Sequence, residues 1–146
     1  MANKSNKHYL STMEEHSIQI TKTGRYFSLG SLSKKTTSVW IVCHGYGQLA
    51  NYFLRNFNVL EDENTYIVAP EGFHRYYLNG FSGRVGASWM TKEDRLSDID
   101  DYVNYLDRVY KSIFSKIDRK NATVNVLGFS QGGATTTSWA CQGKSI

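Results

Sequence analysis

The sequence has little of the material that stabilises secreted, membrane or metal-binding proteins. Its 146 residues include one proline and two cysteines, and Cys43 and Cys141 are too few for a disulfide framework and match no metal-ligand spacing. No apolar run is long enough to span a bilayer, and residues 1–8 contain no apolar segment of the kind that signal peptides require. These absences argue against a metal site, a disulfide scaffold and an integral membrane protein, and they predict a cytoplasmic location.

Basic charge is confined to the start of the chain. The formal net charge is +4, and residues 1–35 account for all of it, because they hold six lysines and arginines but two glutamates. Neither a basic helix nor an aromatic-basic repeat follows, so nucleic-acid binding has little support. We expect residues 1–15 to form a polar, partly disordered lead and residues 16–146 to form one globular domain.

Three short apolar runs predict strands of a buried parallel sheet. Residues 38–43, 65–69 and 122–127 are rich in apolar side chains, which is typical of strands covered by helices on both faces. Residues 17–21 and 26–29 instead alternate between polar and apolar side chains. This alternation predicts two further strands that form an antiparallel hairpin at an edge of the sheet.

Helices are predicted between these strands. Apolar residues recur at helical spacing over residues 92–117, and Thr91 with Asp94 resembles a capping box at the start of this helix. Shorter helices are predicted over residues 49–60 and from residue 131 onward. The alternation of strands and helices along the chain predicts a layered α/β fold with a mostly parallel sheet.

A G-x-S-x-G motif lies where the third buried strand meets the last helix. It places Ser130 between Gly128 and Gly132. A nucleophilic serine must stand clear of the sheet, so the chain has to turn sharply and hold that residue in a strained conformation. Side chains at the two flanking positions would collide across such a turn, and glycine has none. In this strand–turn–helix setting the motif predicts that Ser130 is a catalytic nucleophile.

A second glycine-rich motif follows the first buried strand directly. It comprises His44, Gly45, Tyr46 and Gly47, and a predicted helix comes next. Enzymes whose nucleophilic serine lies at a strand–turn–helix junction have their catalytic histidine after the serine in the chain, whereas His44 precedes Ser130. We therefore expect His44 to be a hydrogen-bonded structural residue.

The chain resembles the phospholipase/carboxylesterase family, which includes the acyl-protein thioesterases and has the α/β-hydrolase fold. The resemblance spans most of residues 38–141. It is carried by the motif at residues 42–47, Ala-Pro at 69–70, Ser-Trp at 88–89, the long helix, and Leu-Gly-Phe-Ser-Gln-Gly-Gly at 127–133. It implies a serine carboxylesterase or thioesterase that needs no cofactor and whose partner is a small-molecule acyl ester or thioester.

The resemblance also implies roles at the site. Ser130 would be the nucleophile, and the backbone N–H groups of Tyr46 and Gln131 would form the oxyanion hole that stabilises a tetrahedral intermediate. Trp89 would lie near the acyl site as a substrate-pocket residue. Five further residues are expected to shape the site without reacting: Gly45, Gly47, Gly128, Gly132 and His44.

The residues that would complete a catalytic triad are missing. α/β hydrolases place the acid and the histidine after the serine, yet the sixteen residues after Ser130 include no Asp, Glu or His. We therefore expect the N-terminal portion of an α/β-hydrolase fold with its C-terminal strands missing. Such a truncated fragment would be inactive by itself and would leave an unpaired edge on the strand before Ser130. The alternative is a non-catalytic binding or interaction domain that has kept the fold and lost its triad.

The segment over residues 71–90 is predicted to be one long functional loop, because unstructured segments of this length are uncommon in compact domains. Glu71 is expected to stabilise this loop with its carboxylate, and His74 is expected to be a surface or loop-anchoring residue. The residues do not distinguish an esterase from a thioesterase or a lipase, nor a monomer from an oligomer.

Overall fold

Four strands form the central sheet of the computed structural model, which describes residues 12–146. Strands β1 (Tyr26–Leu29), β2 (Ser38–Cys43), β3 (Thr65–Pro70) and β6 (Thr123–Gly128) lie in the order β1-β3-β2-β6. β2 pairs in parallel with both β3 and β6, and β1 pairs antiparallel with β3. The three predicted strands therefore form a parallel sheet, with β6 at one edge of it. Burial is confirmed for β2 and β3, whereas β6 is partly exposed, so the prediction of a third buried strand is wrong in that respect. The predicted disordered lead falls mostly outside the described residues.

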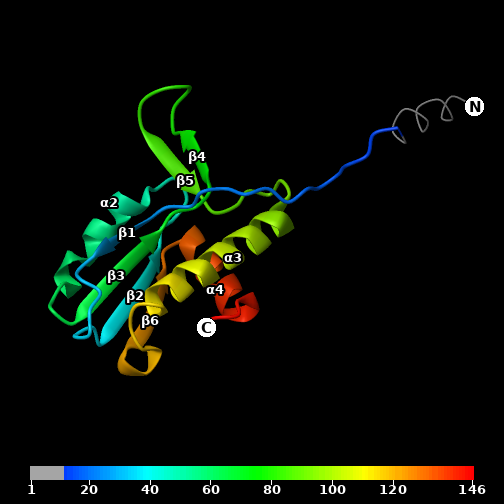
Figure 1. Ribbon diagram of the computed structural model, residues 1–146. Helices are drawn as coiled ribbons and strands as arrows, with labels where there is room; N and C mark the ends of the chain where they lie inside the picture. Colours follow the sequence, from blue (N-terminus) through cyan, green and yellow to red (C-terminus); the bar gives the residue numbers. More distant parts are fainter. Residues whose placement is uncertain (1–11) are drawn as a thin grey trace, which may run out of the picture.

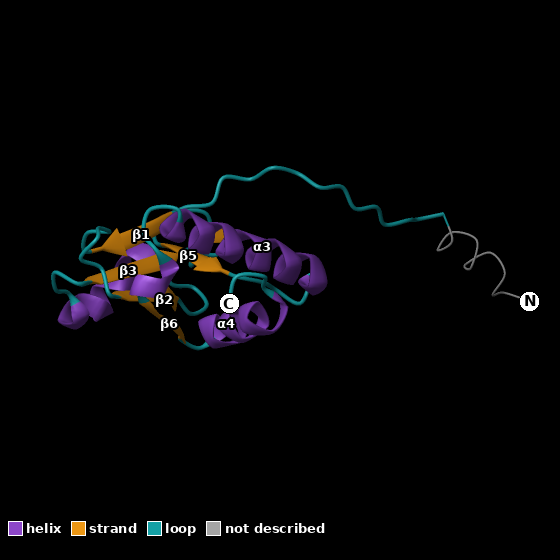
Figure 2. Ribbon diagram, turned by 60° about the horizontal axis from the view of Figure 1, so that its bottom comes forward, coloured by secondary structure: helices purple, strands orange, loops and turns teal. Residues whose placement is uncertain are grey.

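Helices cover both faces of this sheet (Figures 1 and 2). Helix α2 (Ala50–Leu54) and the 3-10 helix η1 (Arg55–Leu60) cover one face, and α3 (Arg95–Phe114) and α4 (Gln131–Gln142) cover the other. A second 3-10 helix, η2 (Arg119–Asn121), leads into β6. The predicted α/β layering is thus confirmed. None of the helices within residues 12–146 combines the length and the apolarity that crossing a membrane requires.

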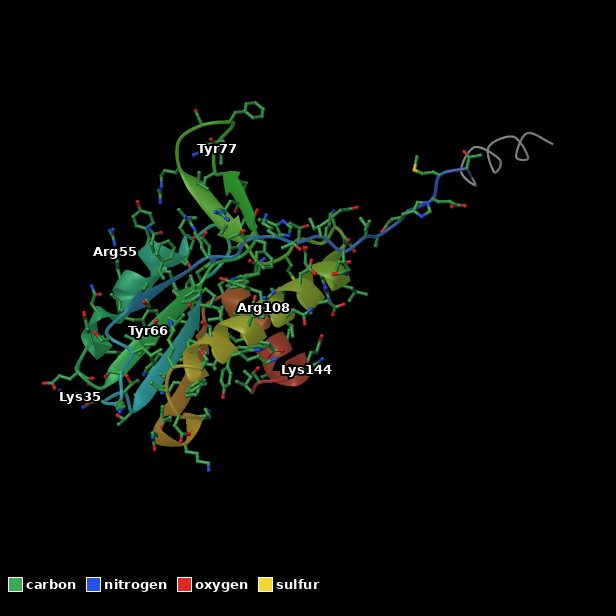
Figure 3. All side chains as sticks on the ribbon, viewed as in Figure 1. Lys35, Arg55, Tyr66, Tyr77, Arg108 and Lys144 are labelled. Atoms are coloured by element: carbon green, nitrogen blue, oxygen red, sulfur yellow. The ribbon has the colours of Figure 1, made fainter. Side chains whose placement is uncertain are left out.

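Side chains of the central strands alternate between two apolar clusters, one on each face of the sheet. Val39 of β2 belongs to the cluster beneath α3 and α4, together with the buried Trp139. Trp40, the next residue in β2, packs into the opposite cluster under α2 and η1. Figure 3 shows Arg55 and Lys144 on these two opposite sides. Burial on both faces explains why β2 and β3 read as nearly continuous apolar runs.

The long helix begins later than predicted and has no capping box. Asp94 precedes its first residue with φ 51° and ψ 43°, and no side chain caps the free N–H groups. Thr91 Oγ1 instead accepts a hydrogen bond from the Glu93 N–H at 3.2 Å, which closes a short turn ahead of the helix. The capping-box prediction is therefore wrong, because serine and threonine hydroxyls stabilise local turns by the same type of bond.

Residues 17–21 do not form the predicted strand. They have no regular secondary structure, and Ile18 and Ile20 are 88% and 80% exposed. β1 pairs with β3 rather than with this segment, so the predicted hairpin is wrong, although β1 does lie at an edge of the sheet. Alternation shows which side chains can share one face, but it does not show which strand is available as a partner.

The predicted loop over residues 71–90 contains a β-hairpin. Strand β4 (His74–Tyr77) pairs antiparallel with β5 (Val85–Ser88), and residues 78–84 connect them. The hairpin projects beyond the end of the four-stranded sheet (Figure 1). Most of β4 is exposed, so it lacks the pattern of buried side chains from which a strand is predicted.

Asp107 of α3 is buried and holds the far end of α4. Its carboxylate accepts hydrogen bonds from Trp139 Nε1 at 2.9 Å, from the Lys144 N–H at 3.1 Å and from the Ser145 N–H at 3.2 Å. Burial by itself would raise the pKa of Asp107, but these hydrogen bonds outweigh burial and lower the pKa below its ordinary value. One carboxylate thus fixes the chain that follows α4 against α3.

We expect Asp107→Asn to lower the free energy of unfolding by about 2 kcal/mol. The amide keeps one acceptor oxygen but turns an NH₂ group toward N–H donors that then lack a partner. Asp100→Asn is the matched control, because Asp100 is exposed on the same helix and should change stability by less than about 0.5 kcal/mol. Urea unfolding followed by tryptophan fluorescence measures both, and equal midpoints for the two variants would contradict the assignment.

Candidate active site

Ser130 lies in the turn between β6 and α4 with a strained backbone. Its φ is 54° and its ψ is −117°, and its hydroxyl caps no N–H of α4. Within residues 12–146 Asp94 is the other non-glycine residue with a positive φ. Such a conformation costs roughly 1–3 kcal/mol for a residue with a side chain. The turn leaves Ser130 exposed at the end of the parallel sheet.

The two glycines of the motif are required by two different contacts. A Cβ atom on Gly128 would lie 2.1 Å from the carbonyl oxygen of Gly132, so the turn itself excludes a side chain there. A Cβ atom on Gly132 would lie 2.1 Å from the carbonyl oxygen of Cys43. The collision expected across the turn is therefore found for Gly128, whereas Gly132 lets the first turn of α4 rest on the end of β2.

The loop over residues 44–47 lies beside this turn. The Phe129 N–H donates to the Cys43 carbonyl at 3.1 Å, and a Cβ atom on Gly45 would lie 3.2 Å from the Phe129 carbonyl oxygen. The N–H of Gly45 donates to the Gln48 side chain, and that of Gly47, where φ is +77°, donates to the Ala87 carbonyl. The Tyr46 N–H between them has no such partner within residues 12–146.

Gln131 presents a second free N–H next to Ser130. It is the first residue of α4, so its N–H has no acceptor inside the helix. The two predicted oxyanion donors therefore lie on neighbouring segments, Tyr46 in the loop after β2 and Gln131 at the start of α4. These segments follow β2 and β6, whose carboxyl ends lie side by side because Cys43 pairs with Gly128.

His44 is fully buried, and both of its ring nitrogens are occupied. Nε2 accepts a hydrogen bond from the Gly72 N–H at 3.0 Å, so Nδ1 carries the proton and donates to the Gly45 carbonyl at 2.8 Å. Burial lowers the pKa of His44, and the Gly45 carbonyl and the charge of Glu71 offset this by less. A neutral imidazole engaged on both sides orients the loop and has no nitrogen left to accept a proton.

Trp89 lies beneath the site rather than on an open surface. It is 1% exposed, its ring stacks on His44 with 5.1 Å between the centroids, and its Nε1 donates to the His44 carbonyl at 2.9 Å. The expectation that Trp89 lines a substrate pocket is corrected by this burial, since a bound acyl chain could not reach the indole without displacing the core. Trp89 therefore supports His44.

Two residues have structural roles that local sequence patterns did not reveal in full. The Gln131 side chain crosses to the end of β5, where it bonds to residues 88–90. Glu71 is 2% exposed, binds Arg25 Nε at 2.7 Å and accepts the Ala50 N–H at the start of α2 at 3.1 Å. Its predicted role in the loop did not include Arg25, which lies far away in the sequence.

Two hollows of the surface lie along α3, away from Ser130. Cavities of about 440 Å³ and 330 Å³ run along α3, and neither is lined by Ser130 or by residues 44–47. Within residues 12–146 no three His, Cys, Asp or Glu side chains gather closely enough to hold a metal ion. Ser130 itself is exposed, so the candidate site is an open turn flanked by the loop over residues 44–47.

Two solved structures resemble this fold. The crystal structure of esterase PE8 matches with a TM-score of 0.60 and 22% identity, covering 81% of this chain and 57% of that one. The crystal structure of Zea mays acyl-protein thioesterase 2 matches with a TM-score of 0.57 and 18% identity, covering 81% of this chain and 51% of that one. No protein-family model matches the chain, and no curated protein matches it in sequence.

The likeness defines the class of fold. The chain has the α/β-hydrolase fold in part, since it spans little more than half the length of either structure. Its mostly parallel sheet and flanking helices agree with that class. At this level of identity the comparison shows the fold alone.

We expect Ser130→Gly to raise the free energy of unfolding by about 1 kcal/mol, because glycine adopts φ 54° and ψ −117° without strain. Asp94→Gly is the matched control. Its left-handed conformation is one that aspartate tolerates, so its gain should be smaller. Chemical denaturation measures both variants, and a loss of stability in Ser130→Gly would contradict the strain assigned to this turn.

We expect stability to fall as the pH drops below about 6.5, the unfolded pKa of histidine. The pKa of His44 is lowered in the folded state, so below about pH 6.5 the unfolded chain binds a proton that the native state does not bind. The contribution is fully present above that pH and is lost at up to about 1.4 kcal/mol per pH unit below it. The unfolding midpoint should no longer fall with pH in this range in His44→Gln. It should still fall in His16→Gln, which is the control because His16 is exposed. An equal pH dependence of the midpoint in the two variants would contradict the role of His44.

Proposed function

We propose that this protein is a serine hydrolase that cleaves carboxylic esters or thioesters through an acyl intermediate on Ser130. The observation that carries the proposal is the positive φ of Ser130 at a strand–turn–helix junction whose glycines admit no side chain. Strain of this kind is retained at functional sites, where it holds a reacting group in place. The coarse likeness to an esterase and a thioesterase supports the same class of reaction.

In the proposed reaction Ser130 Oγ attacks the acyl carbon while its proton passes to a base. A tetrahedral intermediate forms, the bond from carbon to the leaving oxygen or sulfur breaks, and that atom takes up the proton and departs as an alcohol or thiol. Water then attacks the acyl-serine, which releases the carboxylic acid and restores the hydroxyl. One water is consumed for each ester or thioester cleaved, and no cofactor is required.

The backbone N–H groups of Tyr46 and Gln131 are proposed to stabilise the oxyanion. Tyr46 lies on the loop after β2 and Gln131 is the first residue of α4. Both are at the same end of the parallel sheet, and neither N–H has a backbone acceptor within residues 12–146. Preorganised donors of this kind act where negative charge develops, and losing one costs about 3–4 kcal/mol in a model enzyme. The N-terminal end of α4 lies next to Ser130, so the dipole of this helix also favours negative charge there.

The proposed mechanism needs a base, and no histidine within residues 12–146 is hydrogen-bonded to Ser130. His44 has both nitrogens occupied, and His74 Nε2 lies 2.9 Å from Asp98 Oδ1. This observation favours a second candidate function, a non-catalytic binding domain that keeps the fold. The two candidates differ in whether Ser130 reacts when a base is provided.

We expect a fluorophosphonate probe to label Ser130 in the 146-residue chain slowly, and added imidazole to speed labelling about tenfold by acting as the missing base. In this reaction Ser130 Oγ attacks phosphorus, the P–F bond breaks, fluoride leaves and imidazole takes the hydroxyl proton. Intact-protein and peptide mass spectrometry measures the rate and the site of labelling.

Ser130→Ala is the control for probe hydrolysis by imidazole and for labelling elsewhere, and it should show no adduct on the peptide that contains position 130. Ser138→Ala removes another hydroxyl from α4 and should leave the imidazole effect intact. If Ser130 is not labelled at any imidazole concentration, the proposed hydrolase function is refuted and the non-catalytic binding domain remains as the candidate function.

A further inference from the structure

The backbone and the side chain of Gln131 are fastened to different parts of the site. Its N–H is a proposed oxyanion donor, while its carboxamide reaches the end of β5. There Nε2 donates to the Met90 carbonyl at 2.8 Å and to Ser88 Oγ at 3.1 Å, and Oε1 accepts the Trp89 N–H at 3.0 Å. Only a group that both donates and accepts can make these three bonds, so glutamine is matched to this position.

Trp89 joins this anchor to the opposite loop. Its backbone N–H is bound by Gln131, and its indole N–H donates to the carbonyl of His44 at 2.9 Å. The indole is also held from below by an edge-to-face contact with Tyr102 at 6.0 Å. The indole hydrogen bond is buried and the backbone hydrogen bond is partly buried, so breaking the indole bond costs more free energy than breaking an exposed one would.

His44 connects Trp89 to the second proposed donor, the Tyr46 N–H. Its Nδ1–H binds the Gly45 carbonyl at 2.8 Å, and its proton is placed on Nδ1 because Nε2 accepts the Gly72 N–H. The Gly45 carbonyl and the Tyr46 N–H belong to one planar peptide unit. Holding that oxygen therefore sets the direction in which the Tyr46 N–H points.

We propose that Gln131, Trp89 and His44 form a positioning bridge that fixes the N–H groups of Tyr46 and Gln131 relative to each other. The proposal rests on the proposed function and adds residues that do not touch the substrate. It explains why a polar chain of bonds runs through an otherwise apolar region between the two loops. An oxyanion hole works only when its donors keep their places as charge develops, so the bridge should affect the chemical step and not the binding step.

The test is the labelling of Ser130 by fluorophosphonate at a fixed imidazole concentration, with KI and kinact determined separately. Gln131→Met keeps the length of the side chain and removes its three hydrogen bonds, and Trp89→Phe removes the indole N–H. We expect each variant to lower kinact about tenfold and to leave KI unchanged. The kinact of the double variant should be no lower than that of the more impaired single variant. If both residues act through the same bridge, a second break in it has no further effect.

Matched controls remove the same groups elsewhere. Gln142→Met changes an exposed glutamine at the end of α4, and Trp40→Phe removes an indole N–H under α2. Both should keep the wild-type kinact. If Trp89→Phe does not unfold cooperatively, Ser88→Ala takes its place in the double variant, since it removes one of the bonds to Gln131.

Unchanged kinact in Gln131→Met, a loss confined to KI, or additive losses in the double variant would each overturn the bridge. These outcomes presuppose that wild-type Ser130 is labelled. Absence of that labelling refutes the proposed function instead, so the two failures are distinguishable.

Discussion

The first turn of α4 rests directly on the end of β2, and the position of Ser130 depends on this contact. Gly132 makes it possible, because any side chain there would strike the carbonyl of Cys43. The parallel pairing of β2 and β6 sets the register that brings Cys43 opposite Gly128. The loop that follows β2 and the turn that follows β6 therefore meet at the same end of the sheet, as the carboxyl ends of neighbouring parallel strands do.

The strain at Ser130 is offset by attachments at both ends of α4. At the start, the Gln131 carboxamide binds residues 88–90, and at the far end Asp107 binds Trp139 and the chain after the helix. Each such bond contributes about 1 kcal/mol, so several together match the roughly 1–3 kcal/mol that a positive φ costs. A short helix held at two points cannot relax the turn by shifting along its axis.

The same contacts divide the proposed work of the site among residues of different kinds. Ser130 would react, the N–H groups of Tyr46 and Gln131 would receive charge, and the buried pair His44 and Trp89 would keep those groups in place. A neutral His44 suits this role, since a protonated ring could no longer accept the Gly72 N–H. The outer edge of β6 has no partner strand among the described residues, which agrees with a fold present in part.

The sequence by itself determined the layered α/β fold, the buried strands β2 and β3, and the turn at Ser130. These follow from apolar runs, helical spacing and paired glycines, which act over a few neighbouring residues. Only the tertiary structure decided that residues 17–21 lack a partner strand, that residues 71–90 hold a hairpin, and that Trp89 is buried beneath His44. The bonds of Glu71 to Arg25 and of Gln131 to Trp89 join residues 46 and 42 positions apart. Their partners are selected by the packing of the whole chain, because no local pattern specifies which distant group fills a given space.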